Sequence, residues 1–126
     1  MVATKPLRVT WVRDPVFHVR VGVCVGAYAR YVATWQRLGW GGGHVGAESG
    51  AKTTYVQGED GSDVLMVWFS PSAARDMGTV AHEAFHAMVM ALRARGVEAE
   101  SVLDETGAYV LEWVFNAVRL ALNRRR

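Results

Sequence analysis

The spacing of apolar residues changes near Ser70 and divides the chain into a β-rich part and a helical part. Before Ser70, short runs rich in Val, Thr and aromatic residues are separated by turn-forming residues, which is typical of strands. After Ser70, the spacing predicts two long helices, over 77–95 and 102–123. Strands that come before helices favour an α+β fold, and 126 residues suffice for one core. We therefore expect a single domain over 1–126.

The β-rich part contains four candidate strands, over 7–12, 16–23, 52–57 and 63–70. Polar and apolar residues alternate in 16–23, which predicts a strand buried on one face. The run 63–70 is nearly all apolar and follows 52–57 after a Gly- and Asp-rich turn, so we expect a hairpin with 63–70 on the inside. A helix over 27–38, ended by Gly39, lies between the two pairs of strands.

These segments predict a small three- to four-stranded sheet, mixed or antiparallel, packed against the 77–95 helix and the C-terminal helix. The C-terminal helix is apolar nearly all round, which predicts a position in the middle of the domain. The segment 39–50 holds six glycines in twelve residues and is expected to be a loop. Loops carried by a rigid scaffold often line functional sites.

The composition excludes several classes of protein. The 14 basic residues exceed the 12 acidic ones by only two and are spread over both halves, so no nucleic-acid-binding face is expected. The single cysteine, Cys24, excludes an internal disulfide framework and fits a reducing compartment. The most apolar stretch, 108–122, is too short to span a bilayer comfortably and includes Glu112 and Arg119. We expect a soluble cytoplasmic protein that binds neither nucleic acid nor a membrane.

The motif that carries chemistry is His82-Glu83-Ala84-Phe85-His86, an H-E-x-x-H pattern inside the 77–95 helix. Residues four apart lie on one helical face, with Cβ atoms about 5–6 Å apart, so both imidazoles can reach one metal ion. Glu83 is offset by about 100° from His82, which puts its carboxylate beside the metal as a general base. The neighbouring residues are uncharged, so we expect the motif to be buried, where a cation would offset the cost of burial.

A catalytic zinc site needs a third protein ligand. Val89 and Leu92 stand where a longer H-E-x-x-H-x-x-G-x-x-H pattern requires Gly and His, so that pattern is absent. We expect Glu105, at the start of the next helix, to be the third ligand. Its neighbour Asp104 is expected to cap that helix. Glu112 is the alternative third ligand, or a residue that hydrogen-bonds to one of the ligands.

The residues from Thr79 to Ala87, with the later Asp104-Glu105 and Ala108-Tyr109, carry a resemblance to known proteins. The pattern H-E-x-x-H followed by Glu105-x-x-Ala108-Tyr109 resembles the gluzincin branch of the zincin metallopeptidases. More narrowly, it is similar to small zincin-like proteins encoded by bacteriophages and prophages. The resemblance covers about the last half of the chain, and the first half adds a compatible order of strands and a helix.

The resemblance implies that Zn²⁺ bound by His82, His86 and Glu105 supports hydrolysis of amide bonds. Glu83 would take a proton from water and pass it to the leaving amine. The developing oxyanion needs a hydrogen-bond donor, for which Tyr109 is a candidate, and His44 in the glycine-rich loop is another. By the same resemblance, the strand 52–57 would bind a peptide substrate along its edge.

The sequence therefore predicts a zinc-dependent hydrolase, a metallopeptidase that acts on a peptide or protein substrate. The alternative is a non-catalytic binding or assembly protein, for example of a phage particle, in which the metal holds two helices together. If the chain is phage-encoded, the bacterial host cytoplasm is the expected location. The residues leave open the substrate, the choice between zinc and another divalent ion, and the oligomeric state.

Overall fold

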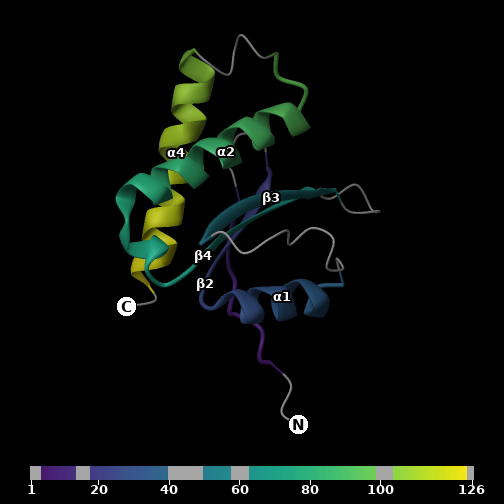
Figure 1. The fold of residues 1–126 in the computed structure, drawn as a ribbon. Helices are drawn as coiled ribbons and strands as arrows, with labels where there is room; N and C mark the ends of the chain where they lie inside the picture. Colours follow the sequence, from purple (N-terminus) through teal and green to yellow (C-terminus); the bar gives the residue numbers. More distant parts are fainter. Residues whose placement is uncertain (1–3, 14–17, 40–49, 58–62, 99–103, 125–126) are drawn as a thin grey trace.

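A computed structural model describes residues 4–13, 18–39, 50–57, 63–98 and 104–124. These residues form a four-stranded sheet with one helix on one face and two helices on the other (Figure 1). The expected α+β fold is confirmed. The turn 58–62 and most of the glycine-rich loop, including His44, lie outside the described residues.

The sheet has the strand order β1-β2-β4-β3 and is mixed. The strands are β1 (Thr10–Arg13), β2 (Arg20–Val25), β3 (Ala51–Gln57) and β4 (Asp63–Phe69). The two central strands, β2 and β4, are parallel, and each edge strand is antiparallel to its neighbour. The expected hairpin is confirmed, since β3 pairs with β4 from Ala51 opposite Phe69 to Gln57 opposite Asp63.

The central strands are buried on both faces. Every residue of β4 is buried, as its apolar sequence predicts. In β2, the four residues between Arg20 and Val25 are also buried, so the expectation of a strand buried on one face is wrong. The reason is tertiary, because helices cover both faces of the sheet where β2 lies (Figure 1).

The helices are α1 (Tyr28–Arg37), the short 3₁₀ helix η2 (Ala73–Arg75), α2 (Met77–Ala94) and α4 (Glu105–Asn123). The core consists of two clusters of buried side chains, one on each face of the sheet. Because side chains alternate along a strand, Met66 and Trp68 of β4 pack under α1 with Trp35. The flanking Leu65 and Val67 pack in the other cluster, with side chains of α2 and α4.

Helix α2 is anchored at its C-terminal end. It ends before Gly96, whose φ of 72° suits a glycine after a helix. Next to this glycine, the guanidinium of Arg95 forms an ion pair with the buried carboxylate of Asp63, at the start of β4. This contact fixes the end of α2 over the sheet, and α2 is the helix that carries the H-E-x-x-H motif.

Helix α4 lies at the surface and not in the middle of the domain. Its inner side, with Val110, Val114 and Val118, is buried. On its outer side, Tyr109 is 56% exposed and Leu120 is 50% exposed, so the expectation of an all-round buried helix is wrong. The backbone N–H of Thr106 donates to the Asp104 carboxylate at 3.0 Å, which confirms that Asp104 caps the helix. Among the described residues, neither this helix nor any other is long and apolar enough to cross a membrane.

Candidate metal centre

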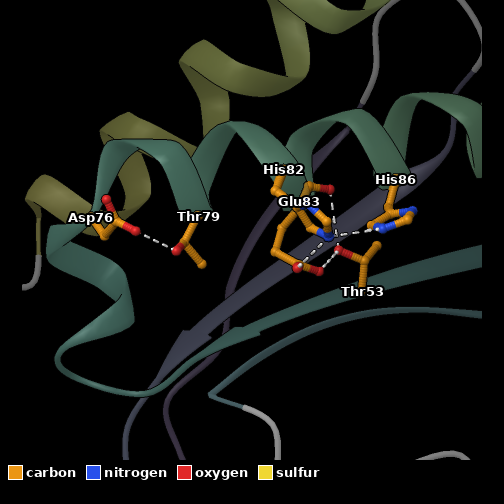
Figure 2. Close-up of polar contacts among 6 residues, drawn as sticks. All are labelled: Thr53, Asp76, Thr79, His82, Glu83 and His86. Atoms are coloured by element: carbon orange, nitrogen blue, oxygen red, sulfur yellow. Dashed lines mark hydrogen bonds and ion pairs between the residues drawn. The ribbon is translucent and has the colours of Figure 1, made fainter.

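The two histidines of the motif lie on the outside of α2, above strand β3 (Figure 2). Both residues are exposed, and the side chain of His82 is 66% accessible. Phe85 between them is also 44% exposed. The expectation that the motif is buried on all sides is therefore wrong for the imidazoles, since uncharged residues on a helix do not by themselves show which side another element covers.

The imidazole rings converge on each other. Their Nε2 atoms lie 3.1 Å apart, and the ring planes cross at 75°. Two nitrogens at about 2.0–2.1 Å from one zinc ion would, at this separation, subtend an angle of about 100° at the metal, close to tetrahedral. The separation of the two nitrogens therefore suits neighbouring ligands of one cation, and without a cation it is also the distance of a hydrogen bond between the two rings.

Glu83 is the buried member of the motif. It is only 6% exposed, and its Oε1 accepts a hydrogen bond from the Thr53 hydroxyl of β3 at 2.8 Å. The same hydroxyl lies 3.1 Å from the backbone carbonyl oxygen of Glu83. Its single proton can be donated either to this oxygen or to Oε1. The other carboxylate oxygen, Oε2, lies 3.8 Å from His82 Nε2. Thr53 thus holds the carboxylate beside the imidazole pair (Figure 2).

Thr53 is a site residue that the sequence analysis missed. The available signal was the alternation along β3, which places Thr53 on the same face as Ala51 and Tyr55, the face that packs toward α2. That pattern shows which face Thr53 occupies. It does not show that the partner across the gap is Glu83, because the pairing depends on how α2 lies over the sheet.

Replacing Thr53 with Val should destabilise the protein by about 1–3 kcal/mol, because a buried carboxylate loses its hydroxyl donor. Replacing Thr53 with Ser keeps the donor and should cost less. Urea unfolding of the two variants and the unchanged protein measures both effects. Equal stability of the Val variant and the unchanged protein would contradict the role assigned to Thr53.

A cleft opens beside Glu83 and His82. Its volume is about 530 Å³, and it is lined by small residues of the 50–51 and 73–79 segments together with Asp76, Thr79, His82 and Glu83. The Thr79 hydroxyl donates to the Asp76 carboxylate at 2.6 Å, and this hydrogen bond lowers the pKa of Asp76. The cleft is therefore polar and reaches from the motif to the beginning of α2.

The structure does not bring the expected third ligand to the histidines. In the described part of the chain, which includes Glu105 and Glu112, no group of three or more His, Cys, Asp or Glu residues is arranged to hold a metal ion. Glu105 is an exposed residue at the start of α4. That end of α4 extends past α2, away from the sheet (Figure 1). The helix contacts α2 and β2, whereas the motif faces β3. The described residues therefore do not bring His82, His86 and Glu105 together as a metal-binding group.

Tyr109 is likewise not part of the cleft. Its side chain lines a groove on the outer side of α4, together with Glu112 and Trp113. The cleft beside the motif is lined by other residues. Tyr109, which was expected as a candidate oxyanion donor, therefore lines the groove along α4 and not the cleft beside Glu83.

Replacing Glu105 with Ala should leave zinc affinity within about twofold of the unchanged protein, since an exposed acid outside the coordination shell adds little. The comparison is made by isothermal titration of zinc, with His86→Ala as the variant that should lose affinity. A loss of zinc binding in the Glu105 variant would reinstate this acid as a ligand.

Comparisons of the chain with protein-family models, with curated proteins and with solved structures gave no match.

Proposed function

We propose that this chain is a zinc-dependent hydrolase that cleaves peptide bonds, with His82 and His86 as metal ligands and Glu83 as the general base. One observation carries the proposal. Two imidazole Nε2 atoms lie 3.1 Å apart beside a carboxylate that is 6% exposed, at the wall of an open cleft. Imidazole ligands with a nearby carboxylate favour zinc over magnesium or calcium, which prefer oxygen ligands.

A zinc ion bound by the two imidazoles would supply a Lewis acid that polarises the carbonyl group of the substrate. The chain itself supplies the base. Thr53 holds Oε1 of Glu83, so Oε2, on the His82 side, is the oxygen that takes a proton from the attacking water. The protonated carboxyl then gives that proton to the leaving amine. A carboxylate fixed by Thr53 keeps one position during both transfers, which is what general acid–base catalysis requires.

The position of β3 at the edge of the sheet favours an extended peptide as the substrate. Strand β3 is the last strand of the described sheet, and within the described residues no strand pairs with its outer edge. Gly50 and Ala51, at the start of β3, line the cleft beside Glu83. An extended peptide that adds to this edge by backbone hydrogen bonds would pass the motif.

A non-catalytic metal-binding role is the second candidate, and a specific observation favours it. Catalytic zinc sites have three protein ligands, while the described residues supply only the two imidazoles. A site with two histidines could hold a metal that joins this chain to a partner without any hydrolysis. The two candidates differ in what they require of Glu83, since only the hydrolase needs a base.

The experiment is cleavage of a mixed peptide library by the zinc-loaded protein, followed by mass spectrometry. The proposal predicts cleavage products that are absent when a zinc chelator is added. Zinc binding without any cleavage, across peptides of varied sequence, would favour the non-catalytic candidate.

A further inference from the structure

Among the described residues that line the cleft, Asp76 is the only charged one outside the H-E-x-x-H motif. Its side chain is exposed, and its Oδ2 accepts the hydrogen bond from the Thr79 hydroxyl. Because this hydrogen bond lowers the pKa of Asp76, the carboxylate is ionised near neutral pH. Within the described residues, no ion pair involves Asp76. A negative charge is therefore available in the cleft to a cation of the substrate.

The distance of Asp76 from the motif suits a neighbouring side chain of a peptide substrate. Figure 2 shows Asp76 and Thr79 at the beginning of α2, with His82 and Glu83 farther along the same helix. His82 follows Asp76 by six residues, which is about 9 Å along the helix axis. An extended peptide covers about 3.3–3.6 Å per residue. A peptide whose scissile bond lies at the motif can therefore bring a side chain two to three residues away to Asp76.

The other walls of the cleft are made of small residues. Gly50, Ala51, Ala73 and Gly78 line it, and none of them has side-chain atoms beyond Cβ. A volume of about 530 Å³ with such walls leaves room for a long side chain. The same walls offer little apolar surface for recognition of an aromatic or branched side chain. Charge is therefore the property by which this cleft can distinguish one peptide from another.

We propose that Asp76 is a specificity-determining residue, and that the preferred substrates carry a Lys or Arg side chain within about three residues of the bond that is cleaved. This inference rests on the proposed function, because it assigns the cleft to a peptide. The pair formed by Asp76 and the cationic side chain is exposed to solvent, so the preference over an uncharged side chain should be about two- to fivefold.

The test compares peptides that differ only in Lys or norleucine at one position, for the three positions on either side of the cleaved bond. Norleucine keeps the aliphatic chain of Lys and lacks its charge. The unchanged protein should favour Lys by about two- to fivefold in kcat/KM at one of these positions. A higher salt concentration should reduce this preference, because ions screen exposed charges.

The variant is Asp76→Asn, which should bring the Lys preference close to onefold. Asp76 is the N-cap residue of α2, and Asn caps a helix about as well as Asp, so this change removes the charge and keeps the cap. Asp104→Asn is the matched control. It removes the same charge from the N-cap of α4, outside the cleft, and should leave the Lys preference unchanged. Circular dichroism shows whether both variants are folded.

The outcomes separate this inference from the proposed function. Cleavage with equal kcat/KM for Lys and norleucine peptides, or a Lys preference that persists in Asp76→Asn, would overturn the role of Asp76 and leave the hydrolase in place. If no peptide is cleaved, the proposed function fails, and fluorescence anisotropy of the same peptides then decides about Asp76. Tighter binding of the Lys peptides that is lost in Asp76→Asn would support the cation site, and equal binding of Lys and norleucine peptides would overturn it.

Discussion

Replacing Glu83 with Gln is expected to lower the rate of peptide hydrolysis by about 10²–10⁴-fold, the usual contribution of a general base. The amide keeps the size of the side chain, and its oxygen can still accept the hydrogen bond from Thr53. What the amide lacks is the ability to take a proton. Zinc affinity should therefore stay nearly unchanged while hydrolysis is lost. Peptide cleavage followed by mass spectrometry, with zinc titration in parallel, measures both.

The control for this variant is Glu98→Gln, which removes the same charge from an exposed residue beyond the end of α2. Its activity should equal that of the unchanged protein. If Glu83→Gln retained full hydrolysis, Glu83 would not be the base. If neither the unchanged protein nor the variant hydrolysed any peptide, the non-catalytic candidate would replace the hydrolase.

Replacing either His82 or His86 with Ala should lower zinc affinity by more than about a hundredfold, since each change removes one of two imidazole ligands. The effect on the metal-free protein should be small, about 0.5 kcal/mol or less, because both side chains are exposed. Binding of zinc to the folded state raises its stability. The melting temperature of the unchanged protein should therefore rise on addition of zinc, and this rise should disappear in both variants.

His18→Ala is the matched control for these two changes. His18 is exposed and lies before β2, outside the cleft, so its replacement should leave the zinc-dependent rise in melting temperature intact. A rise that persists in both His82→Ala and His86→Ala would show that zinc binds elsewhere. A rise lost in only one of them would show that the two imidazoles do not share the ion.

Local patterns in the sequence predicted local structure well. The spacing of His82 and His86 depends only on the geometry of one helix, and the structure places both rings on one side of α2. The ends of the elements follow from residues such as Asp104 and Gly96, whose effects act within one turn. The hairpin of β3 and β4 likewise depends on a short connection between two strands.

Features that depend on how distant elements pack could not be predicted in the same way. The third ligand was placed on Glu105 because of its position in the sequence, yet the crossing of α4 over α2 decides where that acid lies. The contact between Thr53 and Glu83 joins residues of β3 and α2, 30 positions apart, and no periodicity specifies it. The outer side of α4 was expected to be buried because apolar residues lie nearly all round the helix. That pattern does not show which sides of the helix the rest of the domain covers.

His82 and His86 are proposed to bind one divalent cation next to Glu83. Anomalous X-ray diffraction at the zinc absorption edge, from crystals grown with zinc, locates such an ion. We expect one strong peak at about 2.0–2.1 Å from both Nε2 atoms. A peak held by other residues, or fully occupied zinc sites elsewhere with none between these two rings, would contradict the claim.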